Sequence, residues 1–285
     1  KRNHHLRIES DSLLFRKMHH EAMQLGLKKN GTFWGTLLAK LIVYLGFAVL
    51  AYSALIRTSS LPMFYVSYSL YGLSMMLFAF NFSHDFSHDT VFANKKWNHW
   101  GYTLIYTLMG AHAESWKYRH VHSHHFAPNV EGFDSDLSIT GLIRVVPGSE
   151  LRWFHRFQHL YAPVAYMTYS LYWILIKDPV MLFRKEEKVQ KDWAYHLSFW
   201  LQKLVYLTVI LAIPLLFAKH SVFHVLGAFL LMHALQSLFL LFTFFMTHHV
   251  EGTHYPTTDS NGSIKESWVM NQVKSSNDMH PFSWW

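Results

Sequence analysis

The sequence has 285 residues, of which 51% are hydrophobic and 17% aromatic, and it carries a formal net charge of +7. This composition leaves little room for an ordinary soluble surface and indicates an integral membrane protein. Cysteine is absent, which excludes disulfides, thiolate metal ligands and a cysteine nucleophile. The basic residues flank apolar stretches, so their expected partner is an anionic lipid leaflet and not nucleic acid.

Four apolar stretches approach or exceed the length of about 20 residues that crosses a bilayer. They cover residues 33–56, 61–82, 197–218 and 222–246. Lys40 and Lys203 fall inside two of these spans, and a lysine within a span must snorkel or face the interior of a helix bundle. The expected fold class is therefore an all-α integral membrane protein with four transmembrane helices in two hairpins.

Lysine and arginine gather before the first span and between the second and third spans. The positive-inside rule places these segments, and the carboxyl-terminal one, in the cytoplasm as a helical cap. The expected cytosolic segments are 1–32, 83–196 and 247–285, which form a single domain with the spans. Residues 100–113 and 160–176 are apolar, short and rich in aromatics, as is typical of interfacial or re-entrant helices. The expected membrane is the bacterial inner membrane or the endoplasmic reticulum.

Histidines form three clusters that directly adjoin these apolar stretches. The clusters are His84 and His88; His120, His122, His124 and His125; and His248 and His249. Residues four apart share one face of an α-helix, so the first pair, and likewise His120 with His124, can point two imidazoles at one metal. His125 lies about 100° further round such a helix, which favours a dinuclear site. His122 lies on the opposite face and is only a possible ligand.

The expected topology brings all three clusters to one side of the membrane. Imidazole ligation suits zinc, copper, iron or nickel, so spacing alone leaves the metal open. Four aspartates lie next to the clusters: Asp85, Asp89, Asp134 and Asp136. We expect these carboxylates to accept the outer ring N–H of ligating histidines. Within the last span, His224 and His233 are expected to form hydrogen bonds between helices instead.

These stretches resemble the histidine boxes of the membrane fatty acid desaturase family, which take the forms HxxxH, Hxx(x)HH and (H/Q)xxHH. Residues 84–92 are similar to the first box and its flank. Residues 116–125, continuing to Asn129 and the Asp134-Ser-Asp136 motif, are similar to the second. The segments that begin at Arg156 and His248 resemble the acyl-CoA, front-end-like branch. In that branch the position of His248 is a ligand. His249 replaces an apolar neighbour of that ligand and is a further possible ligand in this chain.

The resemblance, which covers about residues 30–285, implies an enzyme with two non-haem iron ions. Such an enzyme uses O2 and two electrons to place a cis double bond in the chain of an acyl-CoA or acyl-lipid. The implied ligands are His84, His88, His120, His124, His125 and His248, with Asn129 among the surrounding polar contacts. Residues 1–32 are too few for a fused cytochrome b5 domain, so a separate electron-transfer protein such as cytochrome b5 or ferredoxin is expected.

Selection of one bond in a uniform methylene chain requires a bent apolar tunnel. The candidates for its wall are Met75, Phe78, Phe82 and Trp116, and those for the headgroup contact are Lys117 and Arg119. Two alternatives stay open. A di-iron lipid hydroxylase shares the first hydrogen abstraction, whereas a histidine-rich transporter of divalent metals would need more ionisable groups in its spans than this sequence has.

The third histidine box of the family is expected after the Ser-Trp-Trp stretch at residues 283–285, where the sequence stops. The single His280 lacks the paired spacing of that box. We therefore expect the sequence to be part of a longer chain, and to be inactive as written.

Overall fold

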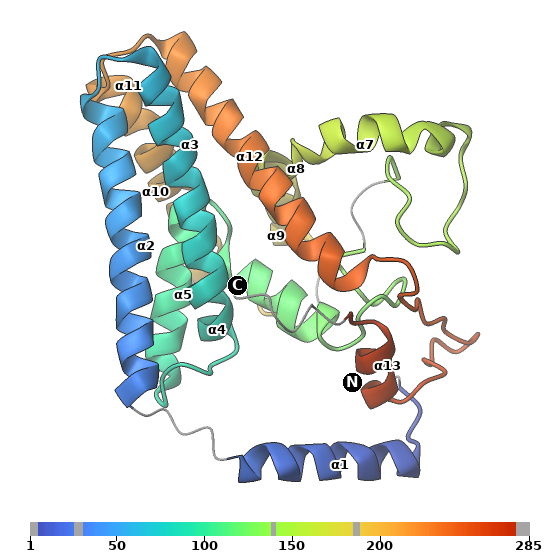
Figure 1. Cartoon of the computed structure of the whole chain (residues 1–285). Helices are drawn as coiled ribbons and strands as arrows, with labels where there is room; N and C mark the ends of the chain where they lie inside the picture. Colours follow the sequence, from blue (N-terminus) through green and yellow to red (C-terminus); the bar gives the residue numbers. More distant parts are fainter. Residues whose placement is uncertain (1–4, 26–30, 138–140, 185–188, 278–285) are drawn as a thin grey trace. The chain divides into compact units, whose positions relative to one another are not determined.

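The computed structural model describes residues 5–25, 31–137, 141–184 and 189–277 (Figure 1). Within these ranges the regular structure is helical, and the β-contacts are two isolated bridges of Ile264, with His5 and with Thr258. The all-α class predicted from the sequence is therefore confirmed.

The contacts within the chain divide it into two compact units, and the expected single domain stays a prediction. The span unit comprises residues 33–117 and 163–240, and the loop unit comprises residues 1–32, 118–162 and 241–285. The loop unit has a small apolar core of its own, formed by Ala127, Val130 and Ile264.

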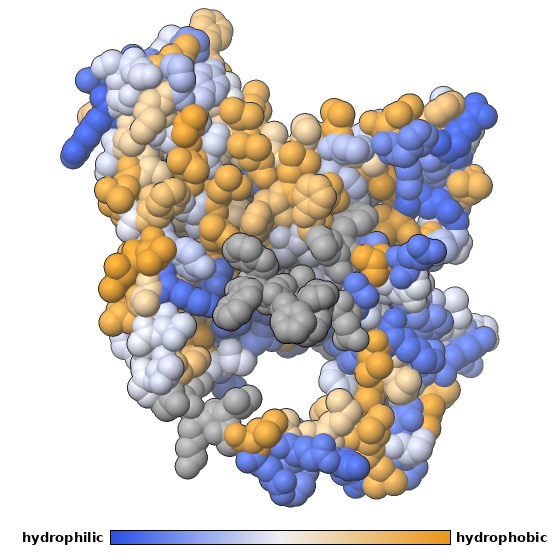
Figure 2. All heavy atoms as spheres, viewed as in Figure 1, coloured by the Kyte–Doolittle hydropathy of each residue, from blue (hydrophilic) through white to orange (hydrophobic). Residues whose placement is uncertain are grey.

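Among the described residues, four helices are long and apolar enough to cross a membrane, and they agree in number and place with the four predicted spans. They cover Gly31–Arg57, Leu61–Ser87, Trp193–Phe217 and Val222–Thr243. Many of their large apolar side chains, such as Ile42 and Leu50, point outward, and Figure 2 shows hydrophobic atoms over much of their visible surface. Such a surface is suited to a bilayer, because its apolar side chains can contact the acyl chains of lipids directly.

Two of the spans contain a π-helical turn. Such a turn holds one residue more than a turn of α-helix. The second span consists of α3 (Leu61–Phe78), a π-turn (Ala79–Ser83) and α4 (His84–Ser87). The third consists of α10 (Trp193–Leu207), a π-turn (Thr208–Ala212) and α11 (Ile213–Phe217). The first is α2 (Gly31–Arg57), and the fourth belongs to α12 (Val222–His248). The second span thus runs five residues beyond the predicted end at residue 82.

Aromatic rings and one glycine bring the spans together within the span unit. The ring of Tyr52 on α2 lies 5.1 Å from that of Tyr71 on α3, and Figure 1 shows these two helices side by side. A Cβ atom at Gly72 would overlap the side chain of Met232 on α12. Glycine is therefore required where α3 and α12 approach each other closely.

Lys203 and His233, inside the spans, have buried partners, whereas Lys40 is exposed and contacts Asn81 Oδ1 at 3.3 Å. Lys203 faces the interior, with its Nζ 2.8 Å from Asp178 Oδ2. His233 forms hydrogen bonds to the hydroxyl groups of Ser170 (2.8 Å) and Tyr206 (2.6 Å), which confirms its predicted role between helices. His224 Nδ1 lies 3.4 Å from the Tyr65 hydroxyl on α3, a longer contact of the same kind.

Shorter helices connect the second and third spans. They are α5 (Lys95–Met109), α6 (Ala113–Arg119), a π-turn (His120–His124), a 3-10 turn (Trp153–Phe157), α7 (Gln158–Tyr166), α8 (Tyr169–Tyr172), a π-turn (Trp173–Lys177) and α9 (Asp178–Phe183). In the loop unit, α1 (Glu9–Gln24) and α13 (Trp268–Lys274) pack together through the rings of Phe15 and Trp268. The apolar segments 100–113 and 160–176 are thus helical over most of their length.

Candidate metal centre

The first histidine pair lies at the end of the second span, in the span unit. The rings of His84 and His88 are 4.8 Å apart, so one helical turn brings them together as the spacing predicts. Burial, together with the charges of His84 and Lys117, lowers the pKa of His88 against the opposing effect of Asp85 and Asp89. The neutral imidazole, which is the form that binds metals, is therefore favoured at this position.

The two aspartates beside this pair have different surroundings. Asp85 is exposed, and its Oδ1 lies 3.6 Å from His84 Nδ1, beyond ordinary hydrogen-bond distance. Asp89 instead faces Lys117, with 3.7 Å between Oδ2 and Nζ. Lys117, a headgroup candidate, also lies over the ring of Tyr102. Its ammonium group is thus held between a carboxylate and an aromatic face.

The second histidine cluster lies on a π-helical turn in the loop unit, where the sequence suggested an α-helix. The backbone N–H of His125 donates to the carbonyl of His120, five residues earlier, at 3.0 Å. This winding brings His120 Nε2 within 3.0 Å of His125 Nε2. The close pair is therefore His120 with His125, whereas the α-helical spacing pairs His120 with His124.

The separation of these two nitrogens fits joint ligation of one metal ion. Two nitrogen ligands that each lie about 2.1 Å from a metal, at right angles to each other, are about 3 Å apart. His120 is buried and His125 half-buried, so protein groups hold both rings in place. The donor set is suitable for iron among other divalent metals.

His124 is oriented by the buried carboxylate of Asp134. Its Nδ1 lies 2.9 Å from Asp134 Oδ2, and because a carboxylate only accepts, Nδ1 carries the proton. Burial opposes the charged ring, but the hydrogen bond and charge of Asp134, with a contribution from Asp136, raise the pKa of His124 overall. The predicted contact between a cluster histidine and Asp134 is thus present.

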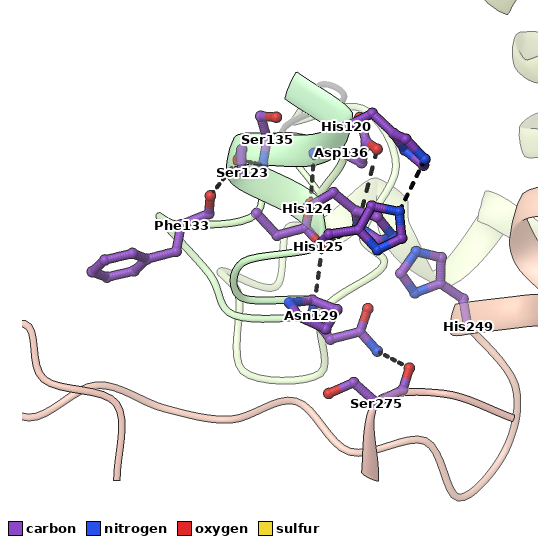
Figure 3. A network of polar contacts seen from close by, with 12 residues as sticks. His120, Ser123, His124, His125, Asn129, Phe133, Ser135, Asp136, His249 and Ser275 are labelled. Atoms are coloured by element: carbon purple, nitrogen blue, oxygen red, sulfur yellow. Dashed lines mark hydrogen bonds and ion pairs between the residues drawn. The ribbon is translucent and has the colours of Figure 1, made fainter. Parts of the chain in front are cut away.

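Backbone groups fix Asp134 in turn. Its carboxylate accepts the N–H groups of Asn129 and Asp136, each at 2.9 Å. Ser123 braces the same loop, because its Oγ donates to Phe133 O at 2.6 Å and accepts the N–H of Ser135 at 2.9 Å (Figure 3). The orientation of the His124 ring therefore depends on the whole loop.

If His124 binds a metal, Asp134→Asn is expected to lower metal affinity about 10- to 100-fold, the usual cost of losing the outer partner of a ligating histidine. The neutral amide accepts the Nδ1 proton more weakly than a carboxylate and has one acceptor oxygen fewer for the loop. Metal retained during titration with a chelator, measured by elemental analysis, checks this result. Asp259→Asn, which changes a carboxylate of the same unit outside the cluster, is the matched control; equal retention in the two variants would contradict the role of Asp134.

Other candidates occupy different environments. His122 is exposed, with its ring 5.9 Å from that of Tyr118. His249 Nδ1 contacts the hydroxyl of Tyr255 at 2.9 Å, and Figure 3 shows the His249 ring turned toward the pair His120 and His125. The side chain of His248 lies outside the described residues, so its ligand role stays a prediction. Arg119, a headgroup candidate, is buried and not on the surface.

The four tunnel candidates are all buried in the span unit. Phe78 and Phe82 contact each other at 5.0 Å between ring centroids, and Trp116 stacks on Tyr106 at 4.6 Å. Met75 is 3% exposed. These contacts are those of a packed core, and a tunnel along them remains a prediction.

Two polar groups of the span unit were not predicted from the sequence. The first is the ion pair of Asp178 with Lys203; the presence of a lysine in a span was the available signal, but its partner was not identified. The second is the hydroxyl of Tyr102, which donates to Glu114 Oε1 at 2.5 Å and contacts His99 Nδ1 at 2.9 Å. No periodic pattern in the sequence indicates this second group.

Residues 59–285 match the family model for fatty acid desaturase. The chain therefore belongs to the fatty acid desaturase family, as the histidine boxes led us to expect.

Curated relatives agree with this assignment. The chain is 29% identical over 209 residues to an acyl-lipid (8-3)-desaturase of Physcomitrium patens, covering 70% of this chain and 43% of that protein. It is 27% identical over 214 residues to an sn-1 linoleoyl-lipid 6-desaturase of Arthrospira platensis, covering 74% and 57%. It is 26% identical over 259 residues to acyl-lipid (8-3)-desaturase B of Dictyostelium discoideum, covering 86% and 55%. The chain spans about half the length of the curated relatives it matches.

Proposed function

We propose that the protein is an oxygen-dependent desaturase that introduces a cis double bond into the fatty acyl chain of a membrane lipid. The observation that carries this proposal is the close pair of imidazole nitrogens, His120 Nε2 and His125 Nε2, in a chain of the desaturase family. The names of the relatives, acyl-lipid and linoleoyl-lipid desaturases, favour an acyl-lipid over an acyl-CoA as substrate.

Two non-haem iron ions are the proposed cofactor, and the histidine clusters are its proposed ligands. They are His84, His88, His120, His124, His125 and His248, with His249 as a further candidate. When bound, the iron ions supply the activation of O2 that removal of hydrogen from an unactivated carbon chain requires. His120 and His125 fit this role by the separation of their nitrogens, and His84 and His88 fit it by sharing one helix face.

The protein groups around the ligands hold protons and exclude water. Asp134 keeps a proton on Nδ1 of His124, so Nε2 is the nitrogen through which His124 would ligate. Burial keeps His88 neutral and ready to ligate. Phe78, Phe82 and Trp116 supply dry apolar walls in the span unit, as a substrate of methylene groups requires.

The arrangement in the membrane is part of the same proposal. The four spans form two hairpins, and the histidine clusters lie on the cytoplasmic side, where an external donor such as cytochrome b5 or ferredoxin delivers electrons. The distribution of lysine and arginine supports this orientation.

We expect cells that express the full-length protein to accumulate a new unsaturated fatty acid, and cells that express His124→Ala to lack it. Gas chromatography with mass spectrometry of total lipids measures the product and locates the double bond. A hydroxy acid in place of the unsaturated acid would show that the protein is a hydroxylase. Identical lipid profiles with and without His124, in the presence of an electron donor, would contradict the proposal and favour metal transport.

A further inference from the structure

A hollow with basic and apolar walls lies in the loop unit, apart from the histidine clusters. Its volume is about 480 Å³, and its lining includes Arg144, Arg152 and Arg156 together with Leu151, Trp153 and Gln158. None of the described residues that line it is acidic. A hollow with three guanidinium groups suits an anionic ligand, and phosphate is the group that arginine binds most readily in two-pronged fashion.

The apolar part of this wall is exposed, although the segment is not one of the four spans. Leu151 is 72% exposed and Trp153 74%, and both Phe157 and Leu160 are also exposed. Figure 2 shows hydrophilic and hydrophobic atoms next to each other around α7 and the segment before it. Alternation of arginine with exposed Trp, Phe and Leu is typical of a helix that lies in the headgroup region of a bilayer.

The hollow is built by hydrogen bonds and is not an accident of loose loops. The N–H of Arg144 donates to Gln158 Oε1, and Gln158 Nε2 donates back to Arg144 O, both at 3.0 Å. Buried His155 accepts the N–H of Arg152 on Nδ1 at 3.0 Å and donates from Nε2 to Gly141 O at 3.1 Å. The loop of 141–149 is thus tied to the turn and helix that follow it.

The guanidinium groups keep capacity for a ligand. Arg152 contacts Glu150 at 3.2 Å, but both side chains are largely exposed, and an exposed pair of this kind is weak. Arg156 lies over the ring of Phe157 at 4.7 Å, and a ring face does not use up the in-plane N–H donors of a guanidinium group. Arg144 donates to the carbonyl groups of Pro147 and Ser149 and therefore shapes the hollow.

We infer that this hollow binds the phosphate of an anionic phospholipid of the bilayer surface, with Leu151, Trp153 and Phe157 inserted among the adjacent headgroups. A phospholipid unites the two properties of the wall, because it has an anionic head and an apolar body. The site anchors the loop unit to the membrane face and does not depend on the metal centre or on the proposed reaction.

The test uses the full-length protein in lipid nanodiscs, labelled with an environment-sensitive fluorophore at a single cysteine. These 285 residues contain no cysteine, so after replacement of every cysteine elsewhere in the full-length chain by serine, Trp153→Cys gives one unique label. Asn261→Cys gives a control label in an exposed turn of the same unit. The quenchers are phosphatidylglycerol and phosphatidylcholine, each with a nitroxide on the acyl chain close below the headgroup.

We expect both lipids to quench the label at position 153, phosphatidylglycerol more strongly, and neither to quench the label at position 261. Arg152→Gln and Arg156→Gln should each reduce the preference for phosphatidylglycerol about fivefold, as loss of one basic residue near an anionic leaflet predicts. Lys265→Gln removes one positive charge elsewhere in the unit and should leave the preference unchanged, and Arg156→Lys should restore part of it.

Two results would overturn the inference. One is a label at position 153 that neither lipid quenches, since that places the hollow in water. The other is loss of the preference on addition of excess inorganic phosphate, since that makes the ligand a soluble phosphate and not a lipid. Persistence of the preference in phosphate buffer supports the lipid assignment.

Discussion

His120→Ala is expected to lower the affinity of the full-length protein for iron by more than about a hundredfold and to abolish its product, whereas His122→Ala leaves both nearly unchanged. Loss of an outer partner of a ligand already costs about 10- to 100-fold, so loss of a ligand itself costs more. The two residues are neighbours on the same turn, but His120 is buried with its Nε2 3.0 Å from that of His125, and His122 is exposed.

The measurement is the iron content of purified protein, by elemental analysis, next to the fatty acid profile of the expressing cells. His125→Ala should behave as His120→Ala does, because the π-turn pairs these two rings. Equal loss of iron from the His120 and His122 variants would show that the wrong face of the turn was assigned. Retention of iron by His125→Ala would contradict a role of the close pair in metal binding.

A large loss of stability is expected from breaking the buried ion pair of Asp178 and Lys203. The Asp178 side chain is fully buried, and the Lys203 side chain is 9% exposed, with 2.8 Å between Oδ2 and Nζ. Asp178→Asn or Lys203→Met alone leaves one buried charge without its partner, which costs about 3–5 kcal/mol. The double variant leaves no such charge and is expected to regain much of that loss.

The ion pair contacts backbone groups at the break between α5 and α6. Asp178 accepts the N–H of His112 at 2.8 Å and that of the Trp173 indole at 2.9 Å, while Lys203 donates to Gly110 O at 2.5 Å. Burial lowers the pKa of His112 to about 4. The charge of Asp178 opposes this shift and the charge of Lys203 adds to it, so the ring is neutral near pH 7. The pair therefore satisfies backbone groups that the helix ends leave open.

Thermal unfolding of the detergent-purified protein measures these changes, with the double variant completing a mutant cycle. A coupling of more than about 1 kcal/mol between the two positions is expected for groups in direct contact. Strictly additive losses would mean that each residue stabilises the fold independently. Lys219→Met, which removes an exposed lysine in the turn between the last two spans, is the control and should change stability little.

Apolar length was a reliable guide to the spans. A run of about 20 apolar residues has few alternatives to a membrane helix, so the four spans were predicted to within a few residues at most ends. The cost of a lysine in lipid left two positions open for Lys203, snorkelling or the interior, and the structure shows the interior one. Its partner was not identified, because Asp178 lies 25 residues earlier in a segment without regular periodicity.

Helix winding limited the prediction of the metal centre. The expected pairing of His120 with His124 assumes 3.6 residues per turn, and no composition signal reveals that the turn of His120–His124 is wound more widely. The contact of His124 with Asp134 was predicted from proximity in the sequence and is present. The contact of Asp89 with Lys117 depends on how α6 packs, which local sequence does not specify.

The π-turn at the second histidine cluster keeps its outer two histidines close together although they are five residues apart. In a box of the form HxxHH the first and last histidines are four residues apart, and an ordinary α-turn stacks them. In the HxxxHH of this chain they are five apart, and the hydrogen bond from His125 N–H to His120 O winds the additional residue into the turn. The longer box is thus an insertion that the helix absorbs as a bulge without separating the outer histidines. We expect deletion of one residue between them to restore α-helical winding, which would place the outer two histidines four apart on one helix face.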